Sequence, residues 1–442
     1  MQTAESQRRS SANRVRSAMS AHGIMGVAIA AMLYLVALSG TVSVFKDELE
    51  VLEQFDHVPR VDALDDQALI RAAEDALSAE TGTAHLLIYL PTIERKVALV
   101  ATDNAEYYLD ASGAVATTKF HPWTDFIIDL HYYLNLPHSF GMIVVATFGV
   151  LLFSMSISGV LAHPNIFKDA FTFRIGRSPR LTQTDIHNRL GVWTLPFHVT
   201  NSLTGAMIGL ASLSALAVAS LNYEGDTTAV FAPVFGGEPA VNAEPAGMAR
   251  FDKALKHLRE NYAYTQPVLI VLHDPQTRGQ YLQVYAEHPE RLIFAEKYNY
   301  NGAGEFLGTV GSADGHLGQQ VADSVYKVHF GSFGGMPVKI AYVLFGVSLM
   351  LIINGGMRVY FFRCVARGRS AGMFLGAWNG LAVGAPILMA LGFALSQWIS
   401  LTQAGYLTIF WCGLALCIAF GLGHSASRVS ETDRASVTLL ER

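Results

Sequence analysis

The chain has 442 residues, of which 51% are hydrophobic and only 15% are charged. Soluble globular proteins carry about 25% charged residues, so this composition excludes an ordinary soluble enzyme. The formal net charge of −5 argues against nucleic acid as a partner. None of the three cysteines (Cys364, Cys412 and Cys417) lies in a polar segment. A disulfide framework and a cysteine-based zinc or iron–sulfur site are therefore excluded.

Six apolar stretches are long enough to cross a bilayer, which needs about 20 residues. They cover residues 24–45, 140–161, 190–215, 337–357, 373–396 and 404–423. The first stretch follows four arginines, so a cleaved signal peptide is the alternative interpretation for it. Because this run is long for a signal peptide and 37–40 is a poor cleavage site, we predict a membrane span.

The charges between the spans predict their orientation. The N-terminus 1–23 and the short loops 162–189 and 358–372 are basic. In contrast, residues 46–130 contain 17 acidic against 6 basic residues, and residues 222–328 contain 13 against 8. The positive-inside rule then places both termini, including the tail 424–442, in the cytoplasm. We predict a multi-pass protein of the bacterial inner membrane with two periplasmic lobes.

The lobes, at 46–139 and 216–336, are each predicted to be small α+β units in which a helix precedes an antiparallel sheet. The predicted helices are 65–81 and 248–262, and the predicted strands are 85–90, 96–101, 106–109, 267–272, 280–286 and 292–298. A turn is expected at 299–304, and the Gly/Pro-rich residues 224–247 are expected to form a loop. Neither lobe contains a nucleophile–base pair, a phosphate-binding loop or a metal-spaced cluster.

An internal repeat is the most informative feature of the sequence. His22 and His187 each begin the pattern H-x3-G-x12-[ST]-G, which ends at Gly40 and Gly205. A second pair of segments, Phe148-Gly149-Val150 and Phe345-Gly346-Val347, precedes Gly159 and Gly356 with equal spacing. Upstream of these segments lie His131 and His329. The span–lobe–span unit is thus duplicated in parallel, about an axis along the membrane normal.

This symmetry predicts two pairs of facing histidines. His22 is expected opposite His187 near the cytoplasmic face, and His131 opposite His329 near the external face. Two facing imidazoles in a helical bundle can be the axial ligands of one b-type haem. We therefore predict two b-type haems in a four-helix bundle, with two further C-terminal transmembrane helices. The whole is expected to be a mainly α integral membrane protein.

Three further histidines are weaker ligand candidates. His198 lies deeper in the third span and is expected to be hydrogen-bonded or near a haem edge. His138 and His163 lie at the two ends of the second span.

The same segments resemble a known family. The stretch from His22 to Gly40, the run 185–193 and the segments 129–131 and 328–331 are similar to the PepSY-associated transmembrane helix family. The run 108–113 resembles the strand–turn ending of its PepSY domains. The resemblance covers about residues 20–360 and supports the four histidine roles, but says nothing of the last two spans.

The resemblance implies an activity. Family members include inner-membrane iron-uptake reductases, in which two haems pass electrons outward to a ferric siderophore. This predicts a ferric-siderophore reductase, with quinol or a separate cytoplasmic reductase as the electron donor. The alternatives are a non-redox, membrane-anchored PepSY regulatory or binding protein, and a haem electron carrier for another acceptor. A transporter is disfavoured because spans 2 and 4–6 are almost uniformly apolar.

Overall fold

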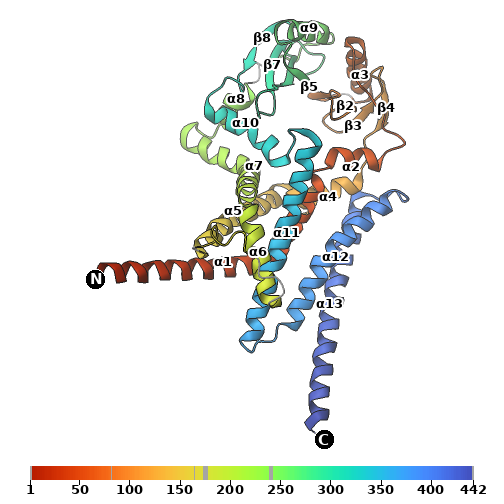
Figure 1. Cartoon of the computed structure of the whole chain (residues 1–442). Coiled ribbons are helices and arrows are strands. Elements are labelled where there is room, and N and C mark those ends of the chain that lie inside the picture. Colours follow the sequence, from red (N-terminus) through yellow and green to blue (C-terminus); the bar gives the residue numbers. More distant parts are fainter. Residues whose placement is uncertain (1, 81, 164, 173–177, 238–241, 441–442) are drawn as a thin grey trace. The chain divides into compact units, whose positions relative to one another are not determined.

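A computed structural model describes residues 2–80, 82–163, 165–172, 178–237 and 242–440 (Figure 1). The chain divides into two compact units. The helical unit comprises residues 1–46, 122–210 and 336–442, and the sheet unit comprises residues 47–121 and 211–335. The chain crosses between these units within α7, so one helix contributes to both.

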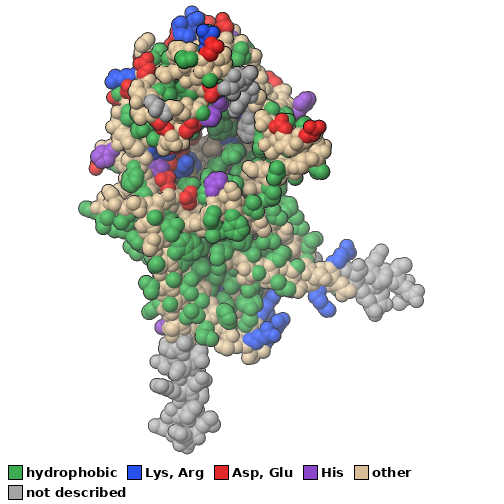
Figure 2. Space-filling model, turned by 180° about the vertical axis from the view of Figure 1, so that it is seen from behind, with side chains coloured by type: hydrophobic (Ala, Val, Ile, Leu, Met, Phe, Trp, Pro, Cys, Tyr) green, Lys and Arg blue, Asp and Glu red, His purple; other side chains and the backbone are tan. Residues whose placement is uncertain are grey.

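The helical unit contains the long apolar helices. They are α1 (Gln2–Ser43), α5 (His138–Ala162), α7 (Leu195–Asn222), α11 (Gly335–Ala366), α12 (Gly372–Ser396) and α13 (Gln403–Leu440), joined by the shorter α4 (Pro122–Tyr133) and α6 (Pro179–Trp193). The six long helices are long and apolar enough to span a membrane. Hydrophobic side chains predominate on the face of this unit that Figure 2 shows. The chain is thus a multi-pass membrane protein with six candidate spans, one for each apolar stretch predicted from the sequence.

The third span begins later than the sequence predicts. α6 ends at Trp193, Thr194 caps it, and α7 begins at Leu195. Pro196 occupies the first turn of α7, where its missing N–H costs no hydrogen bond. His187 therefore lies on the short helix α6 and not at the start of the span.

The sheet unit contains one continuous antiparallel sheet, with strand order β4-β3-β2-β1-β5-β6-β7-β8. Its strands are β1 (His85–Tyr89), β2 (Ala98–Ala101), β3 (Glu106–Leu109), β4 (Val115–Thr118), β5 (Gln266–His273), β6 (Tyr281–Glu287), β7 (Glu296–Asn301) and β8 (Phe306–Val310). Its helices are α2 (Lys46–Glu53), α3 (Asp66–Ala79), α8 (Thr227–Phe235), α9 (Phe251–Asn261) and α10 (Leu317–Phe330).

The two predicted lobes share this sheet. β1 of the first lobe pairs with β5 of the second, from His85–His273 to Tyr89–Leu269. Each of these strands would otherwise be an edge of its own lobe, and the pairing gives its backbone N–H and C=O groups hydrogen-bond partners. α3 and α9 bury their apolar faces in one core that includes Leu69, Phe251 and Tyr298. Asp65 caps α3 by accepting a hydrogen bond from the Ala68 amide at 2.8 Å.

Three details differ from the sequence prediction. The short strands β4 and β8 were not predicted, and β7 runs into the expected turn as far as Asn301. The expected loop 224–247 contains α8, which Asp226 caps by accepting hydrogen bonds from two backbone amides. Residues 238–241 of that segment lie outside the described residues.

Candidate functional site

The repeat histidines of the helical unit meet in space. His22 on α1 and His187 on α6 have ring centroids 6.0 Å apart, with their planes at 79°. The internal repeat predicts this pairing.

Each of these rings is oriented by a backbone carbonyl on another helix. The Nδ1 of His22 donates to the Met155 carbonyl at 3.1 Å, and the Nδ1 of His187 donates to the Ile352 carbonyl at 2.7 Å. A carbonyl oxygen only accepts, so the proton of each neutral ring is on Nδ1 and the lone pair is on Nε2. This tautomer is the one in which Nε2 can bind a metal, and the carbonyl fixes the ring orientation.

A glycine lies against each ring. A Cβ placed on Gly159 would lie 3.3 Å from the His22 ring, and one on Gly356 would lie 3.1 Å from the His187 ring. Each glycine follows its carbonyl residue, Met155 or Ile352, by four positions, which is one helical turn. The repeat seen in the sequence is therefore also a repeat of contacts.

His131 on α4 shows the same arrangement a third time. Its Nδ1 donates to the Val36 carbonyl at 2.9 Å, and Gly40, four residues later, lies against its ring. A Cβ on Gly40 would lie 2.5 Å from that ring. Val36 is 14 residues beyond His22 (36 − 22), which is about 21 Å along a helix. His131 thus contacts α1 about four helical turns from His22.

Burial favours the neutral form of the two histidines that lie outside the long spans. It lowers the pKa of His131 and of His187 below the ordinary value, and the hydrogen bond from each Nδ1 to a carbonyl opposes that shift. A neutral imidazole is the form that ligates a metal.

The distance between the His22 and His187 rings can be compared with that of two imidazoles bound to one metal. With metal–imidazole bonds of about 2 Å and about 1 Å from each nitrogen to its ring centre, two imidazoles on one iron have centroids about 6 Å apart. The 6.0 Å between these rings matches that value. The distance between the two ring centres is therefore compatible with ligation of one metal by both imidazoles.

His329 lies near the end of α10 in the sheet unit, with its ring 5.4 Å from that of Phe330. His131 belongs to the helical unit. The pairing of these two histidines stays a prediction from the repeat.

The weaker candidates have other partners. His198 is hydrogen-bonded at both ring nitrogens, to the Thr194 hydroxyl at 3.2 Å and the Phe345 carbonyl at 3.3 Å. A ligand role would break one of these bonds, so its geometry favours the hydrogen-bonded interpretation. His138 packs against the Tyr133 ring at 4.5 Å, and His163 caps the end of α5.

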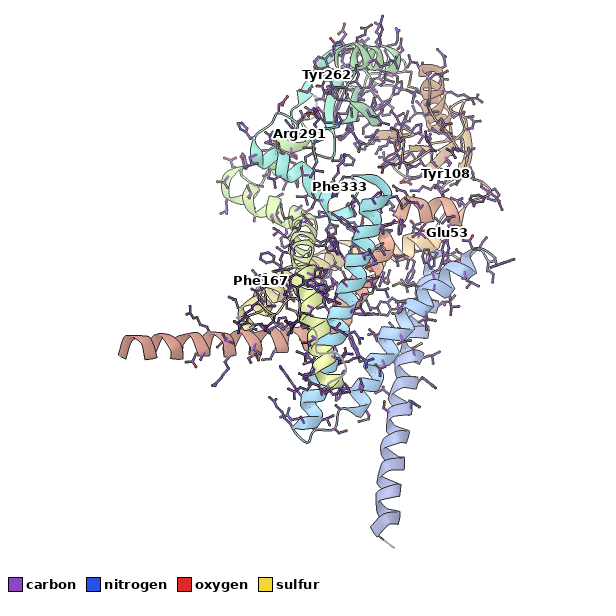
Figure 3. All side chains as sticks on the ribbon, viewed as in Figure 1. Glu53, Tyr108, Phe167, Tyr262, Arg291 and Phe333 are labelled. Atoms are coloured by element: carbon purple, nitrogen blue, oxygen red, sulfur yellow. The ribbon has the colours of Figure 1, made fainter. Side chains whose placement is uncertain are left out.

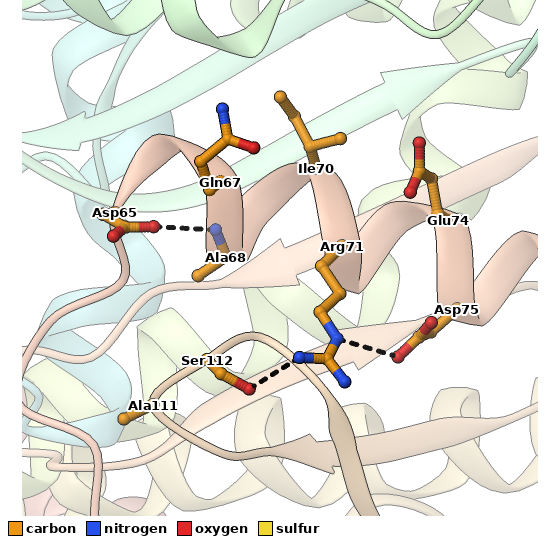
Figure 4. Close-up of a pocket in the computed structure, with 9 residues that line it drawn as sticks. All are labelled: Asp65, Gln67, Ala68, Ile70, Arg71, Glu74, Asp75, Ala111 and Ser112. Atoms are coloured by element: carbon orange, nitrogen blue, oxygen red, sulfur yellow. Dashed lines mark hydrogen bonds and ion pairs between the residues drawn. The ribbon is translucent and has the colours of Figure 1, made fainter.

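No group of three or more metal-binding side chains occurs in the part of the chain that the structure describes. An open pocket beside α3 is lined by Arg71, which contacts Ser112 at 3.1 Å and Asp75 at 3.9 Å (Figure 4). Two tyrosines labelled in Figure 3 belong to the sheet unit. Tyr108 is buried, and the centre of the Tyr262 ring lies 4.5 Å from that of the Tyr298 ring.

The sequence identified the histidines and the glycines but not the carbonyls of Val36, Met155 and Ile352. Every residue has a backbone carbonyl, so residue identity does not indicate which carbonyl accepts a hydrogen bond. The one available signal is the glycine itself, because each carbonyl lies four residues before it.

Comparison with known proteins identifies the family of the chain. The family model for the PepSY-associated TM region matches residues 19–363. An uncharacterized protein of Pseudomonas aeruginosa is 32% identical over 120 residues, which are 27% of this chain and 30% of that protein. The match therefore spans less than a third of that relative. The family match covers both repeats and most of the chain, so this protein belongs to the PepSY-associated TM family.

Proposed function

We propose that this protein is an inner-membrane di-haem b oxidoreductase that reduces ferric siderophore in the periplasm. The observation that carries the proposal is the His22–His187 pair, with centroids 6.0 Å apart and both Nδ1 atoms donating to carbonyls. When bound, each haem supplies a one-electron Fe3+/Fe2+ couple.

The chain's own residues give each site its character. His22 and His187 would hold the cytoplasmic-side haem, and His131 with His329 the external one. With two imidazoles holding each iron, no position would remain open for oxygen, which would favour electron transfer over oxygen chemistry. The carbonyls of Met155 and Ile352 orient the rings and make them more basic, which tunes the potential of the site.

Two sites at different depths suit electron transfer across a membrane. His22 and Val36 differ by about 21 Å along α1, a large part of a hydrocarbon layer about 30 Å thick. The described chain between them is apolar helix, which excludes water and ions from the path.

The acidic balance of the exported segments supports the substrate class. Residues 46–130 carry 17 acidic against 6 basic side chains. Such a surface favours cations and the departure of Fe2+ once it leaves its chelator. Reduction of Fe3+ weakens its bonds to hard oxygen ligands and frees the metal without destroying the chelator. Electrons would come from quinol or from a separate cytoplasmic reductase.

The test uses the purified, haem-loaded protein. It is reduced anaerobically with dithionite, the excess is removed, and ferric siderophores of different sizes are added in the presence of ferrozine. Rapid reoxidation of the haem spectrum with formation of the Fe2+–ferrozine complex supports the proposal. Reoxidation by oxygen or quinone, with no response to any ferric chelate, would identify a haem carrier for another acceptor. A folded protein without haem would favour the non-redox PepSY alternative.

A further inference from the structure

The helix that carries His131 is held from two sides. On one side His131 donates to the Val36 carbonyl of α1 at 2.9 Å. On the other side the Asp129 carboxylate accepts a hydrogen bond from Gln403 Nε2 of α13 at 2.7 Å. Residues two apart on a helix point to nearly opposite faces, which is why α4 lies between α1 and α13.

A second hydrogen bond from α13 holds the end of α4. The indole Nε1 of Trp411 donates to Asn135 Oδ1 at 3.2 Å. Asn135 and the preceding Leu134 have left-handed backbone conformations, with φ of 56° and 53°, and the Asn135 amide donates to the Asp129 carbonyl at 3.2 Å. Because this turn is strained, an outside contact that stabilises it also fixes the last turn of α4, which carries His131.

Apolar contacts continue the same interface. The Trp123 ring lies 4.9 Å from that of Phe393 on α12, and the Phe126 ring lies 5.3 Å from that of Phe410 on α13. Gly392 gives Trp123 its space, since a Cβ there would lie 2.8 Å from the indole nitrogen. Both α4 residues are almost fully buried.

We propose that the α12–α13 hairpin is a positioning element for His131, acting through the Gln403–Asp129 and Trp411–Asn135 hydrogen bonds. The hairpin lies beyond residue 363, where the family match ends. This inference rests on the proposed function, because its consequence is the geometry of an axial ligand. Groups around a ligating histidine set its orientation and the potential of its metal.

The experiment compares two variants with matched controls in the full-length, haem-loaded protein. Gln403→Leu and Trp411→Phe each remove one donor. Gln397→Leu and Trp398→Phe make the same changes at exposed positions of the same hairpin. The readouts are the low-spin EPR signals and the midpoint potential of each haem, assigned with His22→Ala and His131→Ala.

We expect both variants to change the EPR signal and the midpoint potential of the haem at His131, and to leave those of the other haem unchanged. The reduction equilibrium constant of the His131 haem should change at least fivefold, which is about 40 mV for one electron. The controls should match the wild type. Asp129→Asn keeps an oxygen acceptor for Gln403 and should remain close to the wild type, whereas Asp129→Leu should reproduce Gln403→Leu.

Unchanged EPR signals and potentials in both variants would overturn the inference. So would equal shifts at both haems, or controls that shift as much as the variants. If Gln403→Leu fails to retain either haem, the inference is tested with Trp411→Phe alone, because this variant keeps an aromatic ring in place. The same EPR and potential criteria then apply. Absence of haem from the wild type would instead overturn the proposed function, and that measurement comes first.

Discussion

His187 and Gly356 are in direct contact: a Cβ at position 356 would lie 3.1 Å from the imidazole. The contact joins a residue of α6 to the helix whose Ile352 carbonyl orients the same ring. Position 356 therefore controls where the ring of His187 can lie.

Gly356→Val should displace the His187 ring and remove the same haem as His187→Ala. The reason is steric, since the added methyl groups extend further into the space of the ring than the Cβ at 3.1 Å. The measurement is the haem-to-protein ratio by pyridine haemochromogen. Gly423→Val is the control, because Gly423 lies on α13 outside the repeat and a Cβ there meets nothing within 4 Å. Full haem content in Gly356→Val would contradict the site geometry.

The histidine pairs should separate in single variants. His22→Ala and His187→Ala should each halve the haem content and remove the same spectral component, because each leaves the iron with one axial ligand. His131→Ala and His329→Ala should each remove the other component. His198→Gln should retain both haems. Loss of one and the same haem in His22→Ala and His329→Ala would show that the pairing is wrong.

Two glycines of the sheet unit should respond differently to the same change. Gly113 and Gly82 have φ of 80° and 85°, so alanine at either position adds about 1–2 kcal/mol of backbone strain. At Gly113 the new Cβ would also collide with the Ala68 carbonyl, whereas at Gly82 it meets nothing within 4 Å. Thermal unfolding should show a clearly larger loss for Gly113→Ala. Equal losses would contradict the packing of α3 on this turn.

The turn at Asp110 should lose stability in acid. Hydrogen bonds from the Ser112 hydroxyl and from the Ser112 and Ala114 amides lower the pKa of Asp110. A lowered pKa means that the stabilisation is present above the unfolded value of about 4 and is lost as pH falls through the folded value. Asp110→Ala should therefore unfold more easily than the wild type at pH 7, with a smaller difference at pH 3. Asp56→Ala is the control, because Asp56 is exposed. If the stability difference between Asp110→Ala and the wild type were the same at pH 7 and pH 3, the role of the Asp110 carboxylate would be refuted.

The sequence predicts much of this architecture because membrane spans and repeat spacing are both visible in residue order. Long apolar runs locate the helices, and two identical H-x3-G-x12-[ST]-G intervals identify His22 and His187 as equivalent. What the sequence cannot predict is pairing between distant segments. β1 and β5 are apolar strands of different lobes, and no local sequence pattern indicates that they pair with each other.

The same limit applies around His131. The Val36 carbonyl is invisible in the sequence, and Gln403 and Trp411 carry no motif that would connect them with α4. Short strands are also missed, because four or five residues such as those of β4 and β8 give too little alternation to recognise.

The most direct test of the central claim is the haem content of purified, folded protein expressed with ample haem supply. The pyridine haemochromogen assay should give two b-type haems per chain, non-covalently bound because no C-x-x-C-H motif occurs. Reduced and oxidised spectra should be those of low-spin, six-coordinate iron. A folded protein with no haem would contradict the account, since the paired imidazoles of His22 and His187 would then have no cofactor to hold.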